Sequence, residues 1–345
     1  MKKFLVLILA ISLVILSGFS TMAADKTYTI KLGYLGGTDI HKDYEHTMAF
    51  VFKTLVEAQT EGKVKVQLYP GAQLGSDVDM LESVTQNIIQ GTLANEGSLS
   101  RWFPPIEANA IPFLFRSIPV AREMFDGPYG EILKQRLNDE VGLKVLAIGE
   151  VGGFLHFATN KRPVPSPEDL KGLKIRTMQH DGHITFIRSI GGAATPMPFT
   201  ELYTSLQTGL VDGHFNPVSA MVSFKMYEVQ DYLTLTGHLY GPNYLVMNSQ
   251  AFNSFPKNYQ DILISAAEAA KVAARGVNTI AEVTGIAHLK EQGMEIYSPT
   301  AAQREQFKNL SQEKLIAYFV GKFGEEWVET ILEAADEAER KVYSY

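Results

Sequence analysis

Between Pro256 and Gly293 the chain continues without an internal proline and with many alanines, which predicts one helix over roughly 256–292. A proline is tolerated at the first turn of a helix, and a glycine commonly follows its last turn. At 1.5 Å per residue such a helix is about 50 Å long, whereas an average globular helix has about 10–14 residues. A helix of this length can run along two domains, so it favours a two-lobed molecule.

The N-terminal segment is predicted to be a cleaved export signal. Lys2 and Lys3 precede an apolar run over 4–16, and small residues over 17–24 follow it. The apolar run is too short to cross a bilayer, which needs about 20 residues. This order of basic, apolar and small residues is typical of a secretory signal peptide, so we assign 1–24 to it and expect an exported mature chain.

The region after the signal alternates strand and helix patterns. Apolar residues alternate with polar ones over 28–32 and 64–68, which predicts two strands. Helical spacing over 42–60 and a helix capped by Ser76 and extending to about Gln90 complete a β-α-β-α order. This order indicates a mostly parallel sheet covered by helices.

A second region opens near Val151 and repeats this alternation. We expect a strand over 173–177, a helix over about 181–190, a helix from the cap Thr200 to Gly209, and a short buried strand over 210–212. We therefore predict an α/β fold of two lobes with a ligand cleft between them. Lobe I comprises 25–150 plus about 240–280, and lobe II comprises 151–239 plus about 281–345.

Composition excludes several classes of function. The chain has no cysteine, which rules out disulfides, thiolate metal sites and thiol nucleophiles. Removal of 1–24 takes away two lysines and no acidic residue, so the formal net charge falls from −7 to −9. Nucleic-acid binding would require a basic face, and this balance argues against it. An anionic small ligand remains compatible, because one arginine in a cleft outweighs the global charge.

Two polar residues occupy the places where open α/β sheets bind ligands. Arg176 lies at the carboxyl end of a predicted strand, and its planar guanidinium matches a carboxylate with two parallel hydrogen bonds. Asn216 precedes Pro217, which favours an extended backbone, and its amide can both donate and accept. The alternatives are a surface salt bridge for Arg176 and an ordinary Asx-turn for Asn216.

The remaining candidates are weaker on sequence grounds. Phe199 follows Pro196-Met197-Pro198, a rigid loop that could hold its ring over a ligand, although core packing is the commoner fate of a phenylalanine. His180 and His183 suggest a metal pair, but no third ligand is evident, so we expect no metal. Serine-hydrolase, phosphate-loop, dinucleotide and paired-carboxylate motifs are absent from the sequence, so we expect a protein that is not an enzyme and has no cofactor.

Several blocks of the chain resemble one family, the DctP-type solute-binding proteins of tripartite ATP-independent periplasmic (TRAP) transporters. The blocks occur in the family's order over most of the mature chain: LYPGAQLGSDVDMLE (68–82), IPFLFRS (111–117), DGPYGEIL (126–133), NKRPVPSPEDLKGLKIR (160–176), TPMPFTELYTSLQTGLVDG (195–213) and KMYEVQDYLTLTGH (225–238). The resemblance implies a two-lobed periplasmic-binding-protein-like fold that closes around a small organic acid. It also implies a periplasmic location and delivery to the small and large subunits of a sodium-driven membrane permease, and we expect a monomer.

The resemblance also carries residue roles onto this sequence. The family's carboxylate-binding arginine falls on Arg176, its cleft phenylalanine on Phe199, and its asparagine before proline on Asn216. A polar ligand contact a few residues after the family's T-x-H falls on Asn243.

Two departures from the family pattern suggest the ligand class. A second ligand-binding arginine is missing from Gly153-Phe154-Leu155-His156, where His156 is a possible substitute, and Phe215 replaces an acidic residue. Both changes remove charge, and a buried polar ligand group without a partner costs about 1–3 kcal/mol. We therefore expect a monocarboxylate with an aromatic or apolar body, bound by Arg176 and lined by Phe199, Phe215 and Trp102. His214 is expected to point away from the ligand.

Three alternatives remain on sequence grounds. The first is a C4-dicarboxylate or sugar-acid binder of the same family. The second is a secreted α/β enzyme such as a hydrolase, for which the sequence shows no nucleophile or metal constellation. The third is a binding protein of an ATP-driven importer, whose two-lobed shape is similar.

Overall fold

The computed structural model describes residues 26–344, so the signal peptide expected at 1–24 lies outside the described residues. One mixed sheet joins the molecule, in the strand order β2-β1-β3-β8-β4-β7-β5-β6, with β9 paired to β8. The strands are β1 (Tyr28–Gly33), β2 (Val64–Tyr69), β3 (Gly91–Asn95), β4 (Leu143–Thr159), β5 (Lys174–Thr177), β6 (Ala193–Pro196), β7 (Gly213–Asn216), β8 (Tyr232–Asn248) and β9 (Glu295–Tyr297).

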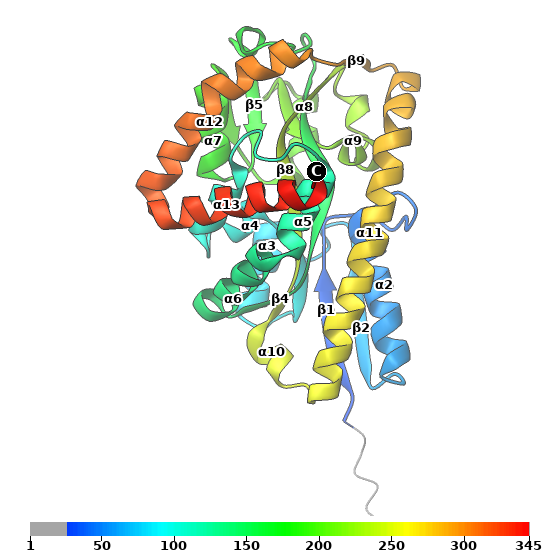
Figure 1. Cartoon of the computed structure of the whole chain (residues 1–345). Coiled ribbons are helices and arrows are strands. Elements are labelled where there is room, and N and C mark those ends of the chain that lie inside the picture. Colours follow the sequence, from blue (N-terminus) through cyan, green and yellow to red (C-terminus); the bar gives the residue numbers. More distant parts are fainter. Residues whose placement is uncertain (1–25, 345) are drawn as a thin grey trace, which may run out of the picture.

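Helices cover this sheet on both sides and form two α/β lobes (Figure 1). The α-helices are α2 (Tyr44–Gln59), α3 (Asp77–Thr85), α4 (Glu96–Leu99), α5 (Ile118–Asp126), α6 (Pro128–Val141), α7 (Asp181–Ser189), α8 (Leu202–Gln207), α9 (Val218–Ser223), α10 (Ser249–Asn253), α11 (Lys257–Glu291), α12 (Ala301–Phe323) and α13 (Glu325–Val342). Short 3-10 turns are η1 (Pro104–Ala110), η2 (Pro167–Leu170), η3 (Phe199–Glu201) and η4 (Met226–Glu228). In the described part of the chain, no helix is both long and apolar enough to cross a membrane.

The first lobe follows the predicted order, with one shorter helix. Strands β1, β2 and β3 pair in parallel, as the β-α-β-α pattern predicts. Ser76 caps α3 in a capping box with Asp79, but the helix ends at Thr85 rather than near Gln90. Asn87 adopts a positive φ of 57°, which stops the helix and turns the chain into β3.

The second lobe differs from the prediction around residues 199–216. Thr200 is not a helix cap, because the turn η3 begins at Phe199 and leads directly into α8. The strand expected over 210–212 is displaced to β7, Gly213–Asn216, because Asp212 instead accepts the backbone N–H of Lys174 through its side chain. The shift moves His214 and Asn216 into the sheet itself.

The two lobes share the central strands β4 and β8, each of 17 residues. These strands are antiparallel, so the sheet is parallel in its outer parts and antiparallel at its centre. Their pairing register shifts between Glu150 and Gly153, where Gly152 and Gly153 adopt φ values of 137° and 96°. A side chain at Gly152 would lie 2.0 Å from the Ser219 hydroxyl oxygen, so this crossing point requires glycine.

The long helix is confirmed. Helix α11 has 35 residues, from Lys257 to Glu291, and follows Pro256 as the sequence predicts. It packs against α2 in one lobe and against α9 in the other, and it crosses β4 between them (Figure 1).

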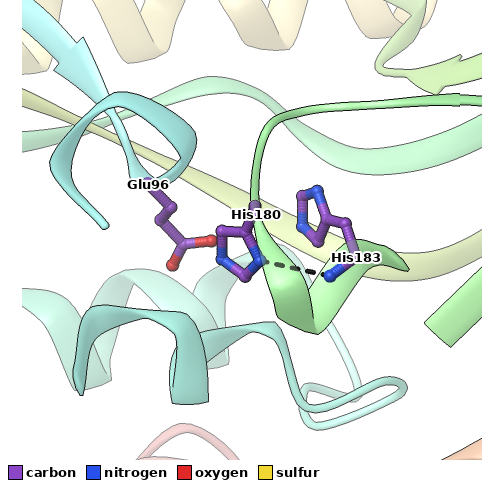
Figure 2. Close-up of side chains that lie close together, drawn as sticks. All are labelled: Glu96, His180 and His183. Carbon is purple, nitrogen blue, oxygen red and sulfur yellow. Dashed lines mark hydrogen bonds between the residues drawn. The ribbon is translucent and has the colours of Figure 1, made fainter. Parts of the chain in front are cut away.

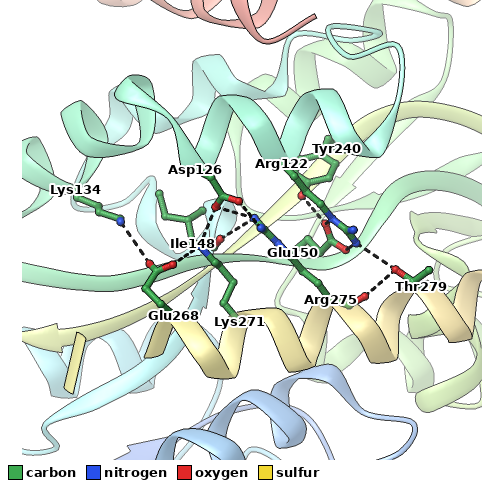
Figure 3. Close-up of polar contacts among 10 residues, drawn as sticks. All are labelled: Arg122, Asp126, Lys134, Ile148, Glu150, Tyr240, Glu268, Lys271, Arg275 and Thr279. Carbon is green, nitrogen blue, oxygen red and sulfur yellow. Dashed lines mark hydrogen bonds and ion pairs between the residues drawn. The ribbon is translucent and has the colours of Figure 1, made fainter. Parts of the chain in front are cut away.

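A network of charged side chains ties α11 to α5 and β4 (Figure 3). Arg122 donates from Nε and Nη2 to the two oxygens of Glu150, at 3.0 and 2.5 Å, and the Tyr240 hydroxyl donates to the same carboxylate at 2.7 Å. Arg275 and Lys271 both donate to Asp126. The network therefore joins the helix to the strand at the point where that strand passes between lobes.

The C-terminal helices divide between the lobes. Helix α12 packs against α7, whereas α13 packs back on α5 and α6, in the segment that the sequence assigns to lobe I. The assignment of 281–345 to lobe II therefore fits α12, whereas α13 packs on helices of lobe I.

Candidate ligand-binding site

A cavity lies between the two lobes. One wall comes from the first lobe and the other from the second, and the lining residues are Leu35, Tyr44, Glu45, Asp77, Val78, Asn95, Gly97, Val151, Arg176, Met178, Gln179, Met197, Pro198, Phe199, Asn216, Pro217, Ala220 and Phe224.

Arg176 is the one cation in this lining. Its guanidinium is buried, and Nε and Nη2 both donate to the carbonyl oxygen of Met197, at 3.1 and 2.8 Å. This arrangement uses one edge of the planar group and leaves the Nη1–Nη2 edge free for a carboxylate. Burial lowers the pKa of Arg176 to about 10, so the group stays charged at neutral pH.

Arg176 has no acidic partner. Across residues 26–344, no carboxylate oxygen lies within 4.0 Å of its nitrogens, although Asp77 and Glu201 raise its pKa at longer range. A buried cation without a counter-ion is costly, and an anionic ligand would offset that cost. The surface salt bridge considered for Arg176 is therefore not what the structure shows.

The opposite wall carries carboxyl groups that sequence reasoning missed. Glu45 is buried, accepting the backbone N–H of Gly36 at 2.6 Å and the Tyr44 hydroxyl at 3.3 Å. Burial, followed by the charge of Asp43, raises the pKa of Glu45 to about 8. Asp77 also lines the cavity and accepts from the amide of Asn95 at 2.8 Å. The site is therefore cationic at one wall and rich in hydrogen-bonding acids at the other.

Asn216 lies in the cavity wall, at the end of β7. Its Nδ2 donates to Nδ1 of His214 at 2.8 Å, so the two side chains share one face of the strand. His214 is not in the cavity lining. It nevertheless shares one face of β7 with Asn216, because side chains two residues apart on a strand lie on the same side. Alternation along the strand therefore does not turn His214 away from the ligand. His214 instead holds the amide of Asn216 in place.

Phe199 also lines the cavity. Its ring lies 5.7 Å from the guanidinium carbon of Arg176 and packs edge-on against Phe224 at 4.7 Å. The ring therefore stands beside the cation, where it can cover the carbon skeleton of a bound acid.

Phe215 and Trp102 lie outside the cavity lining. Phe215 faces away from Asn216 into the core, where its ring packs on Phe157 at 6.0 Å and on His238 at 5.2 Å. The two-residue period of β7 gives the reason, since Phe215 falls between the two residues on the other face. Trp102 packs beside the same core and has Arg101 over its ring at 5.4 Å. The structure therefore does not support these two aromatic residues as walls of the ligand cavity.

His156 and Asn243 are buried in the sheet near the site but are not in its lining. His156 pairs with Asn216 across β4 and β7, and its Nδ1 accepts the backbone N–H of Gly237 at 2.9 Å. Burial lowers the pKa of His156 to about 3, so its ring is neutral and does not replace the charge of an arginine. Asn243 pairs with Asn95 in the sheet, behind the cavity wall.

The chemistry of the lining suits binding rather than catalysis. Among the described residues that line the cavity there is no serine, threonine or histidine, so a nucleophile paired with a base is not available there. The arrangement can hold an anion at one end and hydroxyl groups at the other.

Comparisons with known proteins identify the family of this chain. Residues 36–321 match the family model described as bacterial extracellular solute-binding protein, family 7 (DctP). The chain is 33% identical over 281 residues to the 2,3-diketo-L-gulonate-binding periplasmic protein YiaO of Escherichia coli, covering 81% of this chain and 84% of that protein.

Two solved structures of TRAP periplasmic solute-binding proteins are similar in fold. The protein from Polaromonas sp. JS666, bound to D-erythronate, aligns with a TM-score of 0.83 at 33% identity, covering 88% of this chain and 98% of that one. The protein from Bordetella bronchispeptica, with density assigned to pantoate, aligns with a TM-score of 0.83 at 32% identity, covering 89% and 99%. The chain belongs to family 7 of the bacterial extracellular solute-binding proteins, the DctP-type binding proteins of TRAP transporters, which are transport proteins and not enzymes.

Proposed function

We propose that this periplasmic protein captures a small hydroxylated monocarboxylate and delivers it to the two membrane subunits of a TRAP permease. The observation that carries the proposal is the free edge of the Arg176 guanidinium, buried in the cavity and without an acidic partner. A carboxylate placed there would make two charge-assisted hydrogen bonds.

The charges of the lining favour one carboxylate over two. Arg176 is the single cation among the described lining residues, and the far wall carries Glu45 and Asp77. The second carboxylate of a C4-dicarboxylate would find no second cation there and would lie near the acidic Asp77, whereas Glu45, with its pKa of about 8, is largely protonated at neutral pH. We therefore expect a C4-dicarboxylate to bind more weakly than a monocarboxylate.

The polar far wall favours hydroxyl groups over an aromatic body. Glu45, Asn95 and Gln179 offer donors and acceptors that an aryl or indolyl acid would leave unpaired. Phe215 and Trp102, the aromatic residues expected to surround such a body, do not line the cavity. The sugar-acid alternative is thus better supported than the aromatic monocarboxylate expected from sequence.

The three relatives compared above, which are 32–33% identical to this chain, support the same ligand class. The names of the three similar proteins include D-erythronate, pantoate and 2,3-diketo-L-gulonate, each of which has one carboxylate and several hydroxyl or keto oxygens. The apolar part of the lining, with Met197, Phe199 and Phe224, would cover the carbon skeleton of such an acid. We propose D-erythronate and pantoate as the first compounds to test.

A thermal-shift screen followed by calorimetric titration tests the proposal. D-Erythronate, pantoate and galactonate form one arm, succinate and malate the second, and indole-3-acetate the third. A ligand at 100 times its Kd stabilises the folded protein by about 2.7 kcal/mol, which raises the melting temperature measurably. The largest shift is expected in the first arm, and a larger shift with succinate or indole-3-acetate would refute the ligand class.

A further inference from the structure

A second cluster of polar side chains lies behind the wall of the ligand cavity. It consists of Glu96, from the start of α4, and His180 and His183, from the start of α7 (Figure 2). All three residues are buried, and one ligand-type atom from each lies within 4.8 Å of the others. The sequence indicates no third metal ligand near the two histidines, and the fold brings Glu96 beside them.

Each residue of the cluster has a buried polar atom without a hydrogen-bond partner. Within residues 26–344, no partner is present for Oε1 of Glu96, Nε2 of His180 or Nδ1 of His183. Buried polar groups are normally paired, so three unpaired atoms in one place indicate a bound group that satisfies them. Carboxylate oxygens and imidazole nitrogens are also the atoms that bind zinc in proteins.

A divalent cation would suit the chemistry of these three side chains. Imidazole coordinates a metal ion in its neutral form, and the ion would stabilise the buried Glu96 carboxylate.

We propose that Glu96, His180 and His183 bind a divalent transition ion of the Zn²⁺ class, with a fourth position open to water. Zinc binds nitrogen and oxygen ligands at about 2.0–2.2 Å in a tetrahedral arrangement, so the stacked rings of His180 and His183 would have to turn toward one ion. Two histidines and one glutamate form a ligand set that zinc proteins use.

Metal binding would change the start of α7. Nδ1 of His180 accepts the backbone N–H of His183 at 3.1 Å and so caps the helix. Coordination through Nε2 places the remaining ring proton on Nδ1, and this capping bond is then given up. The helix start therefore reports on occupancy of the site.

The ion would also tie together the two walls of the ligand cavity. Glu96 lies between the lining residues Asn95 and Gly97, and His180 directly follows the lining residues Met178 and Gln179. A side chain at Gly97 would lie 2.8 Å from Met178, so the two segments already approach closely. Bound metal is expected to slow the release of the organic acid by holding these segments together.

Titration of purified, chelator-treated protein tests the site. Zn²⁺ is followed by calorimetry, and Co²⁺ by the visible absorption of a tetrahedral nitrogen–oxygen site. We expect one ion per chain in the unaltered protein and at least tenfold weaker binding in His180→Asn and in Glu96→Gln. Asparagine is a good helix cap, so His180→Asn keeps the fold while removing a ligand. His41→Asn, at an exposed histidine, is the matched control and should bind as the unaltered protein does.

Two results would overturn the assignment. One is the absence of stoichiometric binding of Zn²⁺ or Co²⁺ at neutral pH. The other is binding that His41→Asn weakens while His180→Asn leaves it unchanged, which would place the ion on the surface. If Glu96→Gln does not fold, His180→Asn alone decides, because thermal unfolding of that variant verifies its structure.

Discussion

Arg176 is charged, buried and only partly used by the protein's own hydrogen bonds. Arg176→Ala is therefore expected to weaken binding of the organic acid by roughly 2–5 kcal/mol, the usual cost of removing one partner of a buried charge pair. Titration calorimetry with the best ligand of the screen measures this loss. Arg188→Ala, at an exposed arginine of α7 outside the cavity lining, should leave the affinity within about twofold. Equal affinities of the Arg176 variant and the unaltered protein would show that the guanidinium does not bind the ligand.

Glu45 makes the stability of the ligand-free protein depend on pH. Its folded-state pKa of about 8 lies above the usual 4.5, so the folded protein holds a proton that the unfolded chain releases. The stabilisation is complete below about pH 4.5 and is lost as pH rises to 8, by up to a few kcal/mol at about 1.4 kcal/mol per pKa unit. Denaturant unfolding of the unaltered protein and Glu45→Gln at pH 5 and pH 8.5 measures this. The difference between the two proteins should shift in favour of Glu45→Gln at the higher pH, and a constant difference would contradict the raised pKa.

Of the two walls of the site, one is predictable from the sequence and the other is not. Arg176, Phe199 and Asn216 lie in the cavity lining, because the ends of parallel strands and the loops after them form one edge of the sheet. Glu45 and Asp77 escaped notice, since each lies near a helix start, where an acidic residue is common for structural reasons alone. Phe215 lies on the opposite face of β7 from Asn216, because side chains alternate along a strand, so it does not line the cavity beside Asn216.

Among the elements, the junction of α5, β4 and α11 depends most on charge. Glu150 is almost completely buried, with 1% of its side chain exposed, and receives two hydrogen bonds from Arg122 and one from Tyr240. Arg122→Ala strands this carboxylate and should lower the free energy of unfolding by about 2–4 kcal/mol. Denaturant unfolding at pH 7 measures the change.

Arg116→Ala provides the matched control for that junction. Arg116 pairs with Glu339 at 3.6 Å with 60% of its side chain exposed, so its loss should cost less than about 1 kcal/mol. Similar losses for the two arginine variants would show that the buried network does not hold the junction together.

Elements were predictable where local signals were strong. The long helix was expected over 256–292 and spans Lys257–Glu291, because proline and glycine fix its ends and its interior favours helix throughout. The strands β4 and β8 were not foreseen at their full length, because they are buried on both faces and lack the alternation that marks a half-exposed strand. The antiparallel pairing of β4 with β8 makes the sheet mixed. These two strands are far apart in the sequence, so their pairing produces no local sequence pattern.

Two buried histidines, taken by themselves, should lower the stability of the molecule in mild acid, opposite in sign to the contribution of Glu45. Burial lowers the pKa of His156 and of His214 to about 3, so the unfolded chain binds protons near pH 6.5 that the folded protein does not. Each depressed histidine contributes stability that is present above about pH 6.5 and is lost as pH falls toward 3. The loss at pH 5 is about 2 kcal/mol per histidine. Denaturant unfolding of the unaltered protein and of His156→Asn at pH 7.5 and pH 5 measures it, because the difference between the two proteins isolates this histidine from Glu45. The difference should shift in favour of His156→Asn by about 2 kcal/mol at pH 5, and a constant difference would contradict the neutral ring.

The missing counter-ion of Arg176 has a consequence for transport. With the binding mode proposed above, an anionic ligand compensates this charge, and the protein is more stable when loaded at ligand concentrations above the Kd. Release of the acid then leaves the buried guanidinium uncompensated. We therefore expect the membrane subunits to assist release, by separating the walls of the cavity or by offering the acid a competing site, before the acid is moved inward.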